Sequence, residues 1–120
     1  MATVNLTSEE FEKKLAQPGI TFVDFWASWC GPCKMFGPIF ESASEKFPDI
    51  NFAKVDTDKE QEIAATAQIT SIPTLMAFRD GILVYREAGA LPALQLEELI
   101  KAVQSLDMEQ IKNEISKQGN

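Results

Sequence analysis

The chain has two cysteines and no histidine, and both cysteines fall in one short segment, Trp29-Cys30-Gly31-Pro32-Cys33-Lys34. A structural disulfide would close a loop of about four residues, which is worth only about 2 kcal/mol in chain entropy. A zinc site would need two further ligands, which only carboxylates or a second protomer could supply. Haem attachment would need a histidine at the position of Lys34. The spacing favours thiol–disulfide exchange, because the second sulfur can attack a mixed disulfide on the first.

These cysteines follow a predicted buried strand and begin a predicted helix. Residues 20–27 form a nearly unbroken apolar run, which is typical of a strand buried on both faces, and Asp24 is its one charged residue. The helix is predicted to begin near Pro32, which suits a first helical turn. Free N–H groups and the helix dipole there favour the thiolate form of Cys30.

The remaining elements are predicted from periodicity and from turn and capping residues. Residues 7–10 and 57–60 each match a capping box, and the second is expected to open a helix ending near Gln68. Asp80-Gly81 predicts a hairpin, and a helix is expected after Pro92. The order β-α-β-α-β-α-β-β-α predicts an α/β fold, a mixed sheet of about five strands and about four helices in a three-layer α/β/α sandwich. Strands are predicted at residues 3–6, 20–27, 50–56, 74–79 and 82–88.

Composition suits one domain, which we place at residues 1–106, followed by a C-terminal extension at 107–120. Met108, Ile111 and Ile115 keep a helical spacing but point about 110° away from the preceding apolar stripe. Either Asp107 begins a new helix as its N-cap, or the apolar edge of the extension faces something other than the main core. A frayed end is the alternative.

Charge and hydropathy exclude several classes of function. The chain has 11 basic and 18 acidic side chains, a net charge of −7, which disfavours nucleic acid and anionic membranes as partners. No apolar run reaches the roughly 18 residues that span a bilayer. No secretory signal is visible, and two cysteines are too few for a secreted disulfide scaffold. We therefore expect a cytoplasmic protein.

The sequence resembles the thioredoxins. The segment from Val23 to Met35 matches their active-site signature, and further matches follow in the family's order. These are Lys54, Ser71-Ile72-Pro73-Thr74, Phe78-Arg79-Asp80-Gly81 and Gly89-Ala90. The resemblance covers about residues 3–106 and implies the thioredoxin fold.

The resemblance also implies roles for individual residues. Cys30 matches the exposed attacking cysteine and Cys33 the buried resolving one. Asp24 matches a buried aspartate whose pKa should be raised by burial, so that it can exchange a proton with Cys33. Lys54 is a candidate partner for that charge; alternatively, Asp24 is a polar residue satisfied by buried water or Lys54, without a chemical role.

The other matching residues form the active-site loop and the docking rim. Gly31-Pro32 matches the reducing branch of the superfamily, and with Trp29 and Lys34 it completes the active-site loop. Ile72-Pro73 matches a cis-proline bond beside the disulfide, although the sequence also allows a trans turn. The apolar docking rim is expected at Trp29, Ile72, Gly89 and Ala90, where an extended peptide could pair with the backbone. Phe36-Gly37 departs from the family's usual aliphatic residue and alanine.

The leading hypothesis is a protein-disulfide reductase that is recharged by thioredoxin reductase and acts as a monomer. No nucleotide-binding glycine motif is present, so its electrons come from another protein and no cofactor is expected. A second hypothesis is a docking module that uses the fold without redox chemistry. A third is a metal or iron–sulfur cluster bridged by two protomers.

Overall fold

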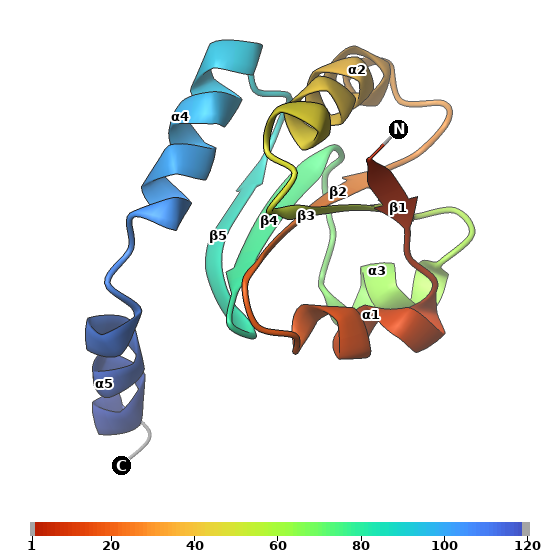
Figure 1. Ribbon diagram of the computed structural model, residues 1–120. Coiled ribbons are helices and arrows are strands. Elements are labelled where there is room, and N and C mark those ends of the chain that lie inside the picture. The colour runs from red at the N-terminus through yellow and green to blue at the C-terminus, as the bar shows by residue number, and fades with distance from the viewer. Residues whose placement is uncertain (1, 119–120) are drawn as a thin grey trace.

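The strands and helices follow one another in the predicted order, and a fifth helix is added at the C-terminal end (Figure 1). The computed structural model describes residues 2–118. The strands are β1 (Thr3–Asn5), β2 (Ile20–Trp26), β3 (Asn51–Asp56), β4 (Thr74–Arg79) and β5 (Ile82–Ala88). The helices are α1 (Ser8–Leu15), α2 (Gly31–Lys46), α3 (Gln61–Thr66), α4 (Ala93–Gln104) and α5 (Met108–Gln118).

The five strands form one mixed sheet in the order β1-β3-β2-β4-β5. β1 and β2 each pair in parallel with β3, whereas β4 pairs antiparallel with both β2 and β5. β2 therefore lies in the middle of the sheet, and Asp24 pairs with Lys54 on one side and Leu75 on the other. The central position explains why the sequence of this strand is apolar on both faces.

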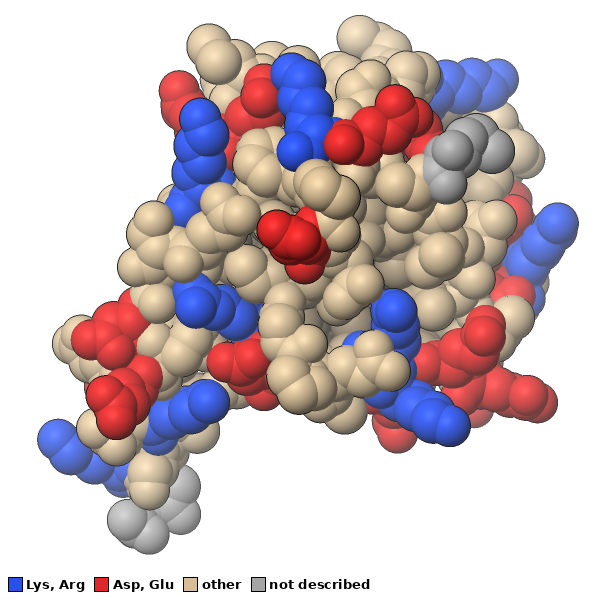
Figure 2. All heavy atoms as spheres, in the orientation of Figure 1, with Lys and Arg blue, Asp and Glu red and all other residues tan. Residues whose placement is uncertain are grey.

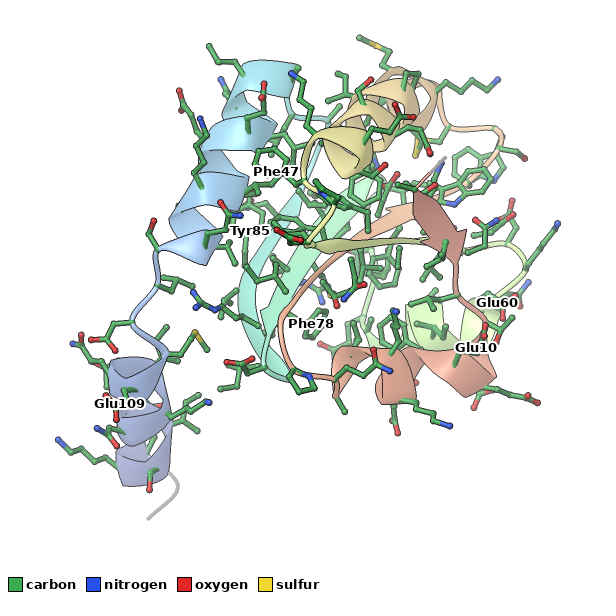
Figure 3. The ribbon with its side chains drawn as sticks, in the orientation of Figure 1. Glu10, Phe47, Glu60, Phe78, Tyr85 and Glu109 are labelled. Atoms are coloured by element: carbon green, nitrogen blue, oxygen red, sulfur yellow. A yellow bond between two sulfur atoms is a disulfide. The ribbon has the colours of Figure 1, made fainter. Side chains whose placement is uncertain are left out.

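Helices cover both faces of the sheet, which confirms the three-layer α/β/α sandwich. α2 and α4 lie against one face and α1 and α3 against the other (Figure 1). Phe47 and Tyr85 pack with the first core, and Phe78 packs with the second (Figure 3). The largest fully buried side chains of the first core are Phe22, Phe36, Phe40, Phe52, Leu75, Leu96 and Ile100. The second core contains Val23, Phe25, Val55, Ile63 and Met76.

Only the first of the two predicted capping boxes forms. Before α1, the Thr7 N–H donates to Glu10 Oε1 over 3.2 Å, as predicted. Before α3, the N–H and the hydroxyl of Thr57 both donate to the carbonyl of Trp26, at 2.9 and 3.0 Å. Glu60 accepts from the Ser8 N–H instead. The prediction of a second capping box is wrong because both of its side chains have partners elsewhere in the fold, and α3 begins only at Gln61.

The C-terminal extension is helical over the residues that the structure describes. Asp107 Oδ1 accepts from the Gln110 N–H over 3.1 Å, which confirms the new N-cap, and α5 buries no side chain. α5 continues beyond α4 away from the sheet, and side chains of both charges cover it (Figures 1 and 2). An ion pair of 3.7 Å joins Lys112 to Asp80 of the β4–β5 turn. Residues 119–120 of the predicted extension lie outside the described residues.

Candidate active site

The two cysteines are joined by a disulfide at the N-terminal end of α2. Cys30 is the N-cap of the helix, and its Sγ accepts a hydrogen bond from the Cys33 N–H over 3.2 Å. Gly31 and Pro32 supply the exposed start of the first turn, and the exposed Lys34 donates its N–H to the Cys30 carbonyl. Both sulfurs therefore lie at the end of the helix where the backbone N–H groups have no partner within the helix.

Both sulfurs are buried in this oxidised form. Cys30 is 5% exposed and Cys33 is 4% exposed, so the expectation of an exposed Cys30 is wrong for the disulfide state. The physical reason is packing: Cys30 Sγ lies 3.6 Å from the Ile72 carbonyl oxygen, and both cysteines pack with Ala27. Their positions on the helix, rather than their exposure, distinguish the two sulfurs.

Asp24 lies beneath α2 and is fully buried. Its register partner in β3 and its neighbour Phe22 place its side chain on the sheet face that α2 covers, and α2 carries Cys33 in its first turn. Neither carboxylate oxygen has a hydrogen-bond partner among the described residues. Burial raises the pKa of Asp24 from 3.8 to about 7, while the charge of Lys54 acts in the opposite direction. Asp24 can thus gain or lose a proton near neutral pH.

The side chain of Lys54 lies near both Asp24 and Trp26. It is the register partner of Asp24, but its Nζ lies 5.0 Å from the centre of the Trp26 ring. A cation over an aromatic face is attracted by the ring quadrupole. Gly37 borders this ammonium, and a Cβ there would make an ordinary contact of 3.9 Å with Lys54 Nζ.

The segment before β4 runs directly beside the disulfide. The Ile72-Pro73 peptide bond is cis, and Pro73 is fully buried. Among residues 2–118, the Ile72 N–H donates to no backbone carbonyl, so it is available to an extended peptide. Gly89 has φ of 111°, a conformation that favours glycine, and its N–H donates to the Pro73 carbonyl over 2.8 Å.

The side chain of Trp29 forms an exposed wall beside this segment. It is 68% exposed, and its Nε1 donates to Asp58 Oδ2 over 3.0 Å. A depression of about 190 Å³ lies between it and the segment that precedes Pro73. The depression is lined by Trp29, Thr57, Ile69, Thr70, Ser71 and Ile72. Gly89 and Ala90 are exposed but lie outside this lining.

Metal ligation has no support among the described side chains. Within residues 2–118, no three or more cysteine, aspartate or glutamate side chains gather where they could hold a metal ion.

Comparison with known proteins decides the family. The sequence model of the family described as Thioredoxin matches residues 2–102. The chain belongs to the thioredoxin family.

Relatives in this family extend over most of the chain. The sequence is 43% identical over 117 residues to "Putative thioredoxin 2" of Streptomyces coelicolor, covering 98% of this chain and 87% of that one. It is 39% identical over 101 residues to the thioredoxin of Bacillus subtilis, covering 83% and 96%. The crystal structure of a Malassezia sympodialis thioredoxin superposes with a TM-score of 0.76 at 31% identity, covering 85% of this chain and 93% of that one. The Streptomyces match is long enough to include most of α5.

The family and the Cys30–Cys33 disulfide together establish the activity as dithiol–disulfide exchange, so this thioredoxin-family chain is a thiol–disulfide oxidoreductase. Membership of the family implies disulfides as substrates and a reductase as partner. No helix within residues 2–118 has the length and apolar character needed to cross a membrane.

Sequence reasoning missed several residues around the site of this thioredoxin-family chain. Asp58 falls within the predicted capping box at residues 57–60, yet its carboxylate accepts the hydrogen bond of the Trp29 indole N–H. Thr57 and Thr70 line the depression beside Trp29. No local pattern identifies these residues, because their partners lie far away in the sequence.

Proposed function

We propose that this chain is a cytoplasmic, monomeric reductase of protein disulfides in which Cys30 attacks and Cys33 resolves. The observation that carries the assignment is the position of Cys30 as the N-cap of α2. Its sulfur already accepts a helix N–H, and in the reduced form the same N–H and the helix dipole stabilise a thiolate there. Cys33, one turn into the helix, lies behind it.

The exchange takes place in two steps. The Cys30 thiolate attacks one sulfur of the substrate disulfide, which breaks that bond, forms a mixed disulfide and releases the other substrate sulfur as a thiolate. Cys33 then loses its proton and attacks Cys30 Sγ, which forms the observed disulfide and releases the second substrate sulfur. The substrate disulfide gains two electrons, and the dithiol of this chain loses two.

We assign the proton transfer in the second step to Asp24. Its pKa of about 7 matches a base that must work near neutral pH, and its two oxygens accept no other hydrogen bond among the described residues. It lies on the sheet face that α2 covers, and α2 carries Cys33 in its first turn. Lys54 is proposed to tune this carboxylate by charge rather than by a direct contact.

We place substrate docking on the exposed rim around the disulfide. Trp29 supplies a large apolar wall, and the free N–H of Ile72 can pair with an extended peptide next to the substrate disulfide. Pro73 and the exposed Gly89 and Ala90 complete the rim, because the Gly89 N–H is bonded to the Pro73 carbonyl. The glycine lets a peptide backbone approach closely.

Reduction of a protein disulfide tests the proposal. The wild-type chain, kept reduced by a small dithiol, should accelerate reduction of an inter-chain protein disulfide, and a variant with both Cys30→Ser and Cys33→Ser should not. Replacing the dithiol by a thioredoxin reductase and its nicotinamide donor should sustain turnover. Sedimentation of the same samples should show a monomer. An intact wild-type dithiol that does not accelerate the reduction would refute the proposal.

A further inference from the structure

Arg86 of β5 reaches across to the loop that carries the docking rim. Its Nη1 donates to the Ala67 carbonyl over 2.6 Å, and its Nη2 donates to the Gln68 carbonyl over 2.7 Å. These carbonyls lie just past the end of α3, where the helix dipole favours a cation. Two charge-assisted hydrogen bonds from one planar guanidinium fix both the position and the orientation of the backbone at Ala67 and Gln68.

The backbone at this point needs such support. Gln68 has φ of 55°, a left-handed conformation that a side chain disfavours. The chain closes the helix here with the Gln68 N–H bonded to the Ala65 carbonyl and the Ile69 N–H bonded to the Ala64 carbonyl. A glycine would adopt this turn without strain. Position 68 is a glutamine, and the guanidinium of Arg86 holds the Ala67 and Gln68 carbonyls that follow the helix.

Arg86 of β5 and Gly89, which directly follows β5, thus hold the loop at both ends. Arg86 binds it at residues 67–68, and Gly89 binds Pro73 through its backbone N–H. Between these two anchors lie four of the six residues that line the depression beside Trp29. They are Ile69, Thr70, Ser71 and Ile72.

We propose that Arg86 is a positioning residue for substrate docking: its two hydrogen bonds to Ala67 and Gln68 set the backbone of residues 69–72, which receives the peptide around the substrate disulfide. The proposal rests on the docking surface assigned under the proposed function. It makes Arg86 act on the affinity for protein substrates and leaves the sulfur chemistry of Cys30 unchanged.

The chain contains a matched control in Arg79. Arg79 also binds carbonyls at the end of a helix, through Nη1 to Val103, Gln104 and Leu106 at 2.7, 3.1 and 3.1 Å. It lies on β4 of the same hairpin, but α4 contributes no residue to the docking rim. If Arg86 only stabilised the fold, replacing Arg86 and replacing Arg79 would have similar effects on KM.

The experiment compares Arg86→Lys with Arg79→Lys. Lysine keeps the charge but cannot supply the planar pair of donors. We expect Arg86→Lys to raise KM for a protein disulfide about fivefold with kcat unchanged, and Arg79→Lys to leave KM at the wild-type value. The rate with a small aromatic disulfide, which needs no docked peptide, should stay the same in both variants. The Gln68 and Ile69 amides, which are bonded to the Ala65 and Ala64 carbonyls, should exchange hydrogen faster only in Arg86→Lys.

An unchanged KM and unchanged exchange in Arg86→Lys would overturn the inference. So would an equal loss with the small disulfide, because Arg86 would then act on the sulfur chemistry. Failure of the proposed function would be visible separately, because the wild-type chain itself would not reduce the protein disulfide. Arg86 is exposed, so Arg86→Lys buries no new group, and the exchange measurement does not depend on turnover.

Discussion

Asp24 and Lys54 are register partners in the centre of the sheet, yet no hydrogen bond joins them. Lys54 Nζ lies over the Trp26 ring, 5.0 Å from its centre, and both Asp24 oxygens remain without a hydrogen bond among the described residues. The ammonium therefore lowers the pKa of Asp24 through space without cancelling the effect of burial, and that pKa stays at about 7. A carboxylate bonded directly to a lysine would remain ionised and would accept protons poorly.

Replacing Asp24 by asparagine should stabilise the oxidised protein at high pH. Unfolded Asp24 ionises near pH 3.8, whereas folded Asp24 keeps its proton to about pH 7. Wild-type stability, relative to the variant, should therefore fall as pH rises from about 4 to about 7 and stay level above, a total change of about 4 kcal/mol. Denaturant unfolding at pH 4, 6 and 8 measures this difference.

Asp80→Asn is a control in which the stability difference from the wild type should change with pH in the opposite direction. A hydrogen bond from the Gly19 N–H, together with nearby cations, lowers the pKa of Asp80. The ionised Asp80 should contribute to stability above the pKa that it has in the unfolded chain, and this contribution should be lost as the pH falls through its lowered pKa in the folded protein. A gap between wild type and Asp24→Asn that does not change with pH would contradict the raised pKa of Asp24.

Removal of the Lys54 charge should raise the pKa of Asp24 further. In Lys54→Met the apolar stem can still cover Trp26, but the ammonium that lowers the Asp24 pKa is gone. The titration of the Asp24 carboxyl, followed by carbon NMR, should move above pH 7, whereas Lys101→Met on the exposed side of α4 should leave it in place. An unmoved titration in Lys54→Met would exclude Lys54 as the tuning charge.

Single cysteine variants should separate the two sulfurs. Cys33→Ser should accumulate a mixed disulfide with a protein substrate, because Cys30 can attack but nothing resolves the product. Cys30→Ser should accumulate little, since Cys33 lies within the first turn of α2 and not at its N-cap. Non-reducing gels of both variants, mixed with the same substrate, show the difference. Equal accumulation would contradict the assigned roles.

Loss of the Asp58 side chain should weaken substrate docking. Trp29 is 68% exposed, and its Nε1–Asp58 hydrogen bond of 3.0 Å restricts the indole. Asp58→Ala should raise KM for a protein disulfide about threefold with little effect on kcat, because a mobile indole must be ordered on binding. Asp58→Asn keeps an acceptor oxygen and should retain most of the affinity. If the alanine and asparagine variants behave alike, the hydrogen bond is not the cause.

Truncation after Leu106 should leave a folded, active domain. α5 buries no side chain, and its ion pair between Lys112 and Asp80 is partly exposed. Such pairs contribute about 0–1 kcal/mol, so Tm should fall by no more than a few degrees and disulfide reduction should persist. The Leu106 carbonyl that Arg79 binds is retained. Thermal unfolding and the reduction assay test this boundary, and an unfolded truncated chain would disprove it.

The sequence by itself determined the elements and the reacting groups, because both depend on close neighbours in the chain. The cysteine spacing, the apolar run around Asp24 and the Asp80-Gly81 turn are local signals, and the structure confirms the elements that they predict. Fold class follows from the order of those elements, since short connections allow few arrangements.

Only the tertiary structure decided how polar side chains find their partners. Thr57 and Glu60 match a local cap, but the fold brings the Trp26 carbonyl and the Ser8 N–H within reach, and these partners replace it. The oxidised Cys30 is buried because the segment at Ile72 packs against it. Arg86 likewise meets the loop after α3 only once β5 has paired with β4. A side chain bonds whichever group the closed chain places beside it, and the spacing of residues along the sequence does not contain that information.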